Sequence, residues 1–249
     1  MLIIDTHVHV GEDRILNIAQ SEDELIRAMD ANQIDVAIVQ PFPGDPNLPR
    51  AHDRIAAMAQ KQSGRIWGLA SLNPHMDPDE YQREMERCIK DLGFVALKCH
   101  PVAHVVMPLT AASDLIYTTA HSLGVPVMVH TGMSINAAGP AVVIPYALRY
   151  PDLPIVIAHS GFALQAFDAM AVAMAFKNVW LETSWTPVTS LRRMIKTLGS
   201  ERIMFGTDSI LNMPVEITRY CSLDLDEKEL RQVFHQTAID LFKLPLTGA

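Results

Sequence analysis

The stretch MLIIDTHVHV at residues 1–10 combines the pattern of a buried β-strand with polar side chains that such a strand rarely carries. Side chains two positions apart on a strand point to the same face, so Asp5, His7 and His9 are predicted to share one. Burying a carboxyl group and two imidazoles without partners would cost on the order of several kcal/mol each. The stretch therefore predicts that other groups inside the fold bind these three side chains.

Further strand patterns follow the first and alternate with stretches of helical periodicity. The eight predicted strands cover residues 2–10, 35–42, 65–74, 94–101, 125–132, 154–161, 179–184 and 202–209. Strands that alternate with helices form parallel sheets, and eight such units in about 250 residues match a (β/α)8 TIM barrel. A doubly wound open sheet is the alternative, but no GxGxxG or GKS/T phosphate loop follows any strand. We therefore expect a single α/β domain over residues 1–249, a (β/α)8 TIM barrel.

Composition and charge narrow the class of partner. The 249 residues are 49% hydrophobic and 19% charged, and no unbroken apolar run is long enough to span a bilayer. A formal net charge of −8 without a basic tract disfavours a nucleic-acid partner. Three cysteines without CxxC spacing fit reduced thiols, and no signal peptide is recognised, so a cytoplasmic location is expected. We expect a small-molecule substrate and no membrane partner, and we leave homo-oligomerisation open.

Polar side chains gather at the carboxyl ends of five predicted strands, where barrel enzymes place their chemistry. Imidazole nitrogens and carboxylate oxygens suit zinc and similar divalent ions, and a catalytic site needs roughly three or four protein ligands. The His7 and His9 pair can supply two ligands, and His130 and Asp208 the third and fourth. Asp5 is predicted to orient an imidazole by accepting its other N–H, with a structural role as the alternative. The full set at the strand ends is His7, His9, Lys98, His100, His130, His159 and Asp208.

Five motifs carry a family resemblance: DTHVHV at 5–10, ALKCHP at 96–101, VMVHTG at 127–132, IVIAHSG at 155–161 and FGTDS at 205–209. In this order they resemble the amidohydrolase superfamily, and in particular amidohydrolase-related family 2. That group includes aminocarboxymuconate-semialdehyde decarboxylase-like enzymes, lactone hydrolases and other metal-dependent hydrolases. The resemblance implies one divalent metal, expected to be Zn2+, bound by His7, His9, His130 and Asp208. It also implies that His159 contacts the substrate or the bound water.

Lys98 and His100 each have two interpretations. Lys98 lies where binuclear amidohydrolases carry a carboxylated lysine that bridges two metals, with His130 and His159 completing the second site. An unmodified Lys98 would instead neutralise a substrate carboxylate, and we prefer a single metal. His100 is two positions after Lys98 and would point to the same inner face if the strand extends that far. It therefore either lines the site or begins the following loop.

The expected chemistry depends on water that a divalent metal activates. We expect hydrolysis of a small ester, lactone or amide, with Asp208 as the base and His159 bonding the developing oxyanion. The alternative is non-oxidative decarboxylation of a small unsaturated or aromatic carboxylic acid at the same metal, and a metal-stabilised binding protein is a third hypothesis. A serine hydrolase is disfavoured because no GxSxG motif is present. Candidates for substrate contact in the loops are Met133, Ser134, Asn136 and Trp185.

Overall fold

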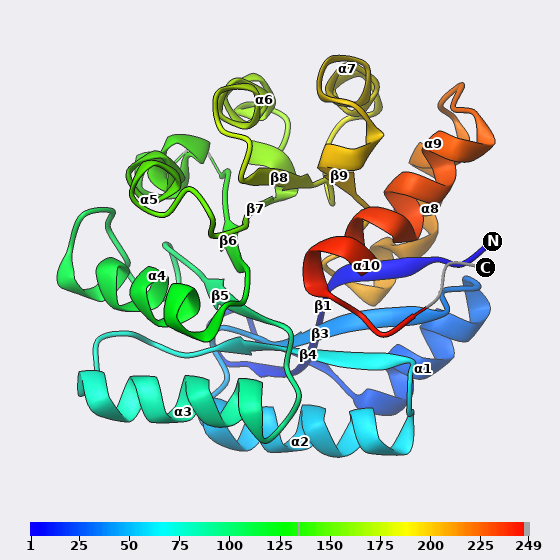
Figure 1. The fold of residues 1–249 in the computed structure, drawn as a ribbon. Helices are drawn as coiled ribbons and strands as arrows, with labels where there is room; N and C mark the ends of the chain where they lie inside the picture. The colour runs from blue at the N-terminus through cyan, green and yellow to red at the C-terminus, as the bar shows by residue number, and fades with distance from the viewer. Residues whose placement is uncertain (134, 247–249) are drawn as a thin grey trace.

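The computed structural model describes residues 1–133 and 135–246, which form a curled sheet wrapped by helices (Figure 1). Within these ranges, nine strands pair in the order β2-β1-β3-β4-β5-β6-β7-β8-β9, and every pair except β1 with β2 is parallel. The strands are Ile4–Asp13 (β1), Ile18–Gln20 (β2), Val36–Pro41 (β3), Ile66–Ser71 (β4), Ala96–Cys99 (β5), Val127–His130 (β6), Ile155–Ala158 (β7), Val179–Glu182 (β8) and Ile203–Met204 (β9). The parallel strands overlap the predicted ones in order, so the α/β class is confirmed.

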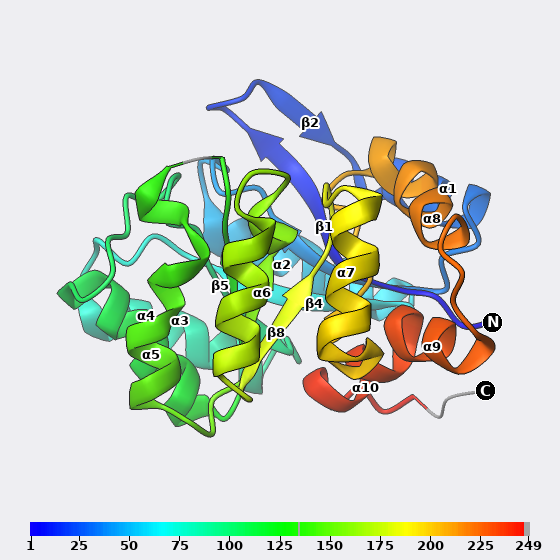
Figure 2. The same cartoon turned by 90° about the horizontal axis from the view of Figure 1, so that it is seen from above.

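The sequence analysis did not predict β2. This short strand folds back on the extended end of β1 as an antiparallel hairpin that projects from the rest of the sheet (Figure 2). The Oδ1 atom of Asp13 accepts hydrogen bonds from the backbone N–H groups of Ile15 and Leu16, at 2.8 and 2.9 Å. Aspartate side chains commonly stabilise tight turns in this way, and the hairpin turn follows from it.

Helices surround the sheet and bury their apolar faces against it (Figure 1). At the start of the first helix, Ser21 and Glu24 exchange the hydrogen bonds of a capping box, as their spacing indicates. Among the described residues, no helix has the length and apolar character needed to cross a bilayer. The α-helices are Glu22–Ala31 (α1), Leu48–Lys61 (α2), Pro78–Lys90 (α3), Ala111–Leu123 (α4), Ile144–Arg149 (α5), Ala166–Ala175 (α6), Val188–Leu198 (α7), Met213–Cys221 (α8), Glu227–Arg231 (α9) and Thr237–Phe242 (α10).

The space enclosed by the sheet has an apolar end and a polar end. Ala96 and Met128 belong to an apolar cluster that α10 completes with Phe242 and neighbouring side chains. Lys98 and His130 lie two residues further along the same strands, so they point to the same side at the carboxyl ends. The alternation along the strands therefore places Lys98 and His130 next to this apolar cluster, at the carboxyl ends of the strands. We call the cluster the apolar floor.

An irregularity in β1 brings its two histidines into the enclosed space. The register between β1 and β3 shifts between Asp5 and Val8. Ile4 belongs to the apolar floor, whereas Val8 belongs to the core between sheet and helices. Simple alternation from Ile4 would turn His7 and His9 toward the helices, and the shift reverses this. The sequence analysis assumed a regular strand and did not predict the shift.

Backbone contacts join β1 to the segment that follows β9. The Thr6 N–H donates to the Phe205 carbonyl at 3.1 Å, and the Asp208 N–H donates to the His7 carbonyl at 2.6 Å. Val8 and Asp208 also form an isolated parallel bridge. These contacts connect the first parallel strand to the last, and they place Asp208 beside the β1 histidines.

Candidate metal centre

His7, His9 and Asp208 form a compact group of donor atoms at the carboxyl end of the sheet. The Oδ1 atom of Asp208 lies 3.3 Å from the Nε2 atoms of both histidines. The His7 side chain is fully buried, and the Asp208 side chain is 25% exposed. The group is thus a carboxylate beside two imidazole nitrogens, a donor set that divalent metals prefer.

The His7 ring is oriented by Glu182, at the end of β8. The Oε2 atom of Glu182 accepts a hydrogen bond from Nδ1 of His7 at 2.8 Å, and both side chains are fully buried. The same carboxylate also accepts backbone N–H groups from His159 at 3.1 Å and Ser184 at 2.5 Å. Because Nδ1 carries the proton in this arrangement, the lone pair of His7 is on Nε2 and faces Asp208.

The His9 ring is oriented by the end of β3. Its Nδ1 atom donates to the carbonyl of Pro41 at 3.0 Å, so its Nε2 lone pair also faces the centre. Phe42 stacks against the ring with a centroid distance of 4.8 Å. The side-chain nitrogen of Gln40 approaches His9 Nε2 at 3.2 Å. Both strand-1 histidines therefore present the same ring atom to Asp208, although different strands orient them.

Lys98 lies inside the group. Its Nζ atom is 2.9 Å from Nε2 of His7, and the residue is 2% exposed. Burial lowers the pKa of Lys98 to about 8, against the attraction of Asp208 and Glu182. In this structure the amine occupies the His7 lone pair that a metal ion would take.

His130 and His159 contact each other beside the group of His7, His9 and Asp208, and the centroid of the His159 ring lies 4.8 Å from that of His7. Nε2 of His159 lies 3.0 Å from Nδ1 of His130, and Nδ1 of His159 lies 2.8 Å from the Ser184 hydroxyl. Nε2 of His130 is buried and has no hydrogen-bond partner within the described residues, which leaves it free to bind a ligand. The His100 ring stacks on His130 with a centroid distance of 4.1 Å, which places His100 next to the site.

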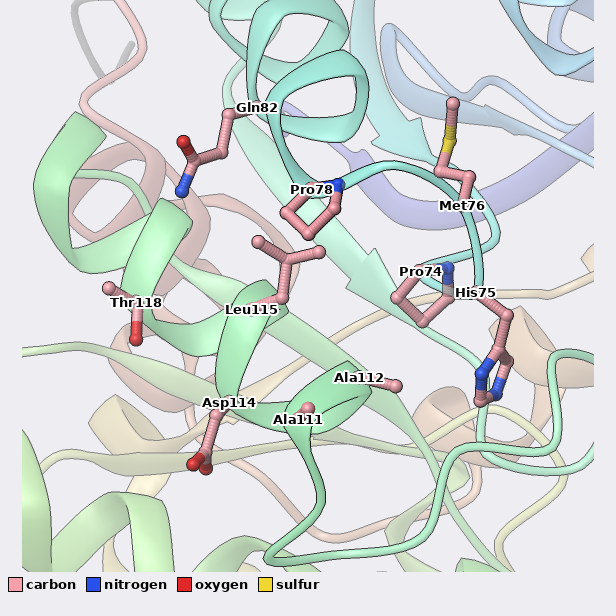
Figure 3. A pocket seen from close by; sticks show the side chains of 10 residues that line it. All are labelled: Pro74, His75, Met76, Pro78, Gln82, Ala111, Ala112, Asp114, Leu115 and Thr118. Carbon is pink, nitrogen blue, oxygen red and sulfur yellow. The ribbon is translucent and has the colours of Figure 1, made fainter.

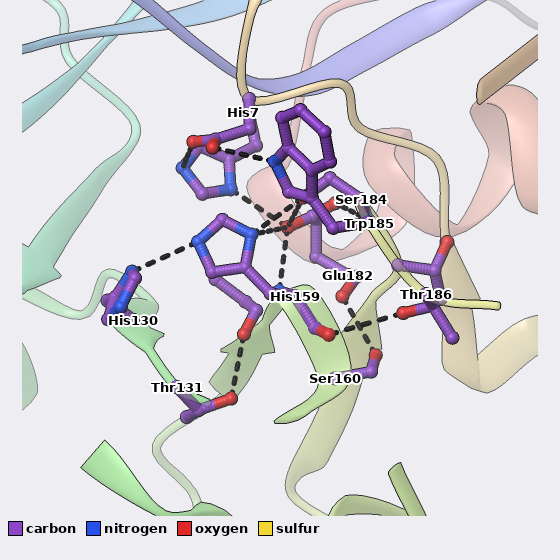
Figure 4. Close-up of polar contacts among 12 residues, drawn as sticks. His7, His130, Thr131, His159, Ser160, Glu182, Ser184, Trp185 and Thr186 are labelled. Carbon is purple, nitrogen blue, oxygen red and sulfur yellow. Dashed lines mark hydrogen bonds and ion pairs between the residues drawn. The ribbon is translucent and has the colours of Figure 1, made fainter. Parts of the chain in front are cut away.

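Burial keeps these imidazoles neutral. It lowers the pKa of His159 to about 3 and lowers the pKa values of His130 and His100 well below the usual value. Neutral imidazole is the form that binds metal ions. Figure 4 shows His159 between His130 and Glu182.

The loop candidates differ in where the structure places them. The indole N–H of Trp185 donates to Oδ2 of Asp208 at 2.8 Å, which brings this loop to the centre (Figure 4). Met133 and Asn136 are exposed on the segment after β6, where they make no described contact with the centre. Ser134 lies outside the described residues.

Asp5 takes the structural role that was its alternative in the sequence analysis, and Glu182 takes a role that the sequence analysis did not assign. The prediction that Asp5 orients an imidazole is wrong, because its carboxylate accepts the backbone N–H of His7 and both the N–H and hydroxyl of Thr207. Glu182 performs the orienting role instead, and the sequence analysis missed it. The available signal was an acid that ends the otherwise apolar run VWLE at 179–182.

Two other features of the molecule contribute nothing to this centre. His52, Glu84 and Cys88 form a separate compact group, but His52 already bonds the Glu84 carboxylate at 2.8 Å and the Ser71 backbone at 3.0 Å. A cavity of about 540 Å³ lies between the starts of α3 and α4 and is lined largely by apolar side chains (Figure 3). Its lining contains none of the metal-centre residues, so we assign it no part in the chemistry.

Comparison with known proteins places the chain in a family. Residues 4–244 match the family model for amidohydrolases of the Amidohydro_2 group. Gamma-resorcylate decarboxylase from Polaromonas sp. (strain JS666 / ATCC BAA-500) is 25% identical over 300 residues, covering 93% of this chain and 89% of the relative.

Solved structures share the fold. An uncharacterised TIM-barrel protein from Bordetella bronchiseptica superposes with a TM-score of 0.80 and 17% identity, covering 98% of this chain and 99% of that protein. A dihydroxybenzoic acid decarboxylase from Polaromonas sp. JS666, solved with bound manganese and the inhibitor 2-nitroresorcinol, gives a TM-score of 0.78 and 20% identity over 99% and 98% of the two chains. The family model matches residues 4–244, so the chain belongs to the amidohydrolase family, as the five sequence motifs predicted.

Proposed function

We propose that this protein is a metal-dependent, non-oxidative decarboxylase of a small hydroxylated aromatic carboxylic acid. The observation that carries the proposal is the similarity to a gamma-resorcylate decarboxylase across 93% of the chain, and a compact group of two histidines and an aspartate accompanies it. The comparisons thus favour the alternative of the sequence analysis over hydrolysis of an ester, lactone or amide. The donor atoms alone would serve either reaction.

The residues at the centre fit a divalent metal. His7, His9 and Asp208 would hold it, and His130 would join them through the buried Nε2 atom that lacks a partner. When bound, the metal would supply positive charge that binds and polarises the acidic oxygens of the substrate. A structural neighbour was solved with manganese, whereas zinc was expected from sequence, so the identity of the metal is part of the proposal.

Asp208 is the group we assign to proton transfer. Its side chain is 25% exposed, whereas those of His7 and Glu182 are fully buried, so a substrate can reach it. In the reaction, the bond between the ring carbon and the carboxylate breaks, and its electron pair stays on the ring carbon. That carbon then takes a proton from Asp208, which has accepted it from the substrate or from water, and CO2 leaves.

His159 and Lys98 receive supporting roles. Both ring nitrogens of His159 are hydrogen-bonded to protein groups, so we assign it to holding His130 and no longer to contact with an oxyanion. Lys98 is almost fully buried, and in a protein interior an ammonium group attracts carboxylates more strongly than in water. We propose that Lys98 is unmodified and helps to draw the substrate carboxylate toward a single metal.

We further propose that the chain is one closed (β/α)8 barrel domain. The backbone bonds from Thr6 to Phe205 and from Asp208 to His7 support closure, because they link the first parallel strand to the segment after the last. Closure would keep Asp208 and the β1 histidines in fixed relation.

The metal assignment has a direct test. Purified protein should contain about one equivalent of manganese, zinc or a similar divalent ion by elemental analysis. The double substitution of His7→Ala with His9→Ala should empty the site, because it removes two of the donors. Substitution of the exposed His121, which bonds Asp152 on the outer surface, is the matched control. Full metal content in the double variant would remove the β1 histidines from the site.

The reaction is tested by CO2 release. The protein should release CO2 from gamma-resorcylate or another hydroxybenzoate, lose this activity on chelation and regain it with a divalent metal. Asp208→Asn should lower the rate by about 100-fold or more, as expected for loss of a proton-transfer group. Asp152→Asn, which changes an exposed carboxylate paired with His121, should leave the rate unchanged. Absence of CO2 from every acid in a hydroxybenzoate panel would reject the proposal.

A further inference from the structure

We propose that Trp185 is a positioning residue that fixes the Asp208 carboxylate, and that Glu216 in turn holds Trp185. The inference rests on the proposed metal centre, since it concerns which oxygen of Asp208 faces that centre. It does not depend on which reaction the metal supports.

The two oxygens of Asp208 have different partners. Oδ1 lies 3.3 Å from Nε2 of both His7 and His9, and Oδ2 accepts the indole N–H of Trp185 at 2.8 Å. A partial rotation of the carboxylate, which would bring both oxygens toward the centre, would break the hydrogen bond to the indole. The indole therefore holds Oδ2 away from the centre and leaves Oδ1 as the oxygen available to a metal.

The Trp185 backbone adopts a conformation that its side chain does not favour. Its φ angle is 64°, in the left-handed region that bulky residues seldom occupy. The side chain is also 38% exposed, so burial of the ring in a core does not explain the conformation. Strain of this kind persists where surrounding contacts enforce it, and it concentrates at functional sites.

Glu216 supplies those contacts. It lies on α8 and is fully buried, and its Oε1 atom accepts the backbone N–H of Trp185 at 2.6 Å. Oε1 also accepts the side-chain N–H of Asn212 at 2.8 Å, and that same amide donates to the carbonyl of Thr207 at 2.9 Å. Thr207 directly precedes Asp208, so one buried carboxylate ties the loop of Trp185 to the loop of Asp208.

The test is the affinity for Mn2+ of the full chain after chelation. Trp185→Phe keeps the aromatic ring and removes the N–H donor, and Glu216→Ala removes the acceptor that holds the loop. Both should weaken Mn2+ binding by about 10- to 100-fold, the usual effect of losing a partner that orients a metal ligand. Glu216→Gln keeps an acceptor oxygen and should recover part of the loss.

Trp180→Phe is the matched control, because the indole of Trp180 donates to the carbonyl of Glu201 instead. Its Mn2+ affinity should stay within about twofold of the wild type, and thermal unfolding should show that each variant is folded. If Trp185→Phe does not fold, the Mn2+ affinities of Glu216→Ala and Glu216→Gln test the inference instead.

The inference is overturned if Trp185→Phe, or in its place Glu216→Ala, binds Mn2+ as tightly as the wild type. It is also overturned if Trp180→Phe loses as much affinity as Trp185→Phe. Failure of the proposed function gives a different result. The Trp185→Phe and Glu216→Ala variants would then still bind Mn2+ more weakly than the wild type, but the wild type would release no CO2 from any hydroxybenzoate.

Discussion

Glu182 offers the sharpest test of how the centre is organised. Its buried carboxylate accepts Nδ1–H of His7 at 2.8 Å, the backbone N–H of His159 at 3.1 Å and the backbone N–H of Ser184 at 2.5 Å. Glu182→Ala leaves these buried donors without an acceptor, and each loss costs about 1–3 kcal/mol. The three losses are not fully additive because the donors are neighbours, so we expect the free energy of unfolding to fall by about 3–5 kcal/mol in total.

The same substitution should weaken metal binding. Without Glu182, the His7 ring can turn or protonate on the other nitrogen, so Nε2 no longer faces Asp208 with a free lone pair. We expect the dissociation constant for Mn2+ to rise by about 10- to 100-fold. Glu182→Gln keeps one acceptor oxygen, so it should lower the free energy of unfolding and the affinity for Mn2+ by less than Glu182→Ala does.

Two measurements check this prediction. Urea unfolding with chelator present gives the stability of the metal-free chain, and titration with Mn2+ gives the affinity. Glu227→Gln, on the exposed helix α9, is the control and should change neither. A Glu182→Ala variant that loses less than about 1 kcal/mol and binds Mn2+ like the wild type would refute the reasoning.

Two further predictions concern stability away from the centre. Burial alone would raise the pKa of Glu84, but hydrogen bonds from His52 and a neighbouring arginine outweigh it and lower this pKa from 4.5 to about 2. A depressed pKa stabilises the fold above about pH 4.5, and this stability is lost as the pH falls toward 2; after reduction for partial solvation we expect about 1–2 kcal/mol. Urea unfolding between pH 5 and 2 should therefore show a shallower decline for Glu84→Gln, and an unchanged pH profile would contradict the assignment. Gly68→Ala would bring a Cβ atom to 2.2 Å from a ring carbon of Phe94, so we expect a loss of about 1–3 kcal/mol, partly recovered when Phe94→Leu is added. Wild-type stability of Gly68→Ala would show that the ring moves without cost.

Much of the fold could be predicted from sequence because its signals are local. Apolar runs mark the parallel strands, and polar residues mark their carboxyl ends. The rule that barrel chemistry lies at those ends also predicted that His7, His9 and Asp208 would come together, and the structure places Oδ1 of Asp208 3.3 Å from Nε2 of each histidine. The family assignment followed from the same strand-end motifs and is confirmed by the family model.

The remainder depends on contacts that local patterns do not encode. The register shift in β1 arises from pairing with β3, so a regular alternation assigned Asp5 to the wrong role. Glu182 bonds His7 across 175 positions of sequence, and an acid at the end of a strand is equally compatible with exposure to solvent. His130 turns toward His159, which depends on side-chain rotamers.

Isotope labelling tests the central claim most directly. The metal-loaded enzyme is incubated with hydroxybenzoates, including gamma-resorcylate, and separately with esters and lactones, in D2O containing 18O-labelled water. We predict release of CO2 from a hydroxybenzoate, one deuterium on the ring carbon that lost it, and no 18O in the organic product. Uptake of 18O into the carboxylate product of an ester or lactone, with no CO2 from any hydroxybenzoate, would contradict decarboxylation and establish hydrolysis.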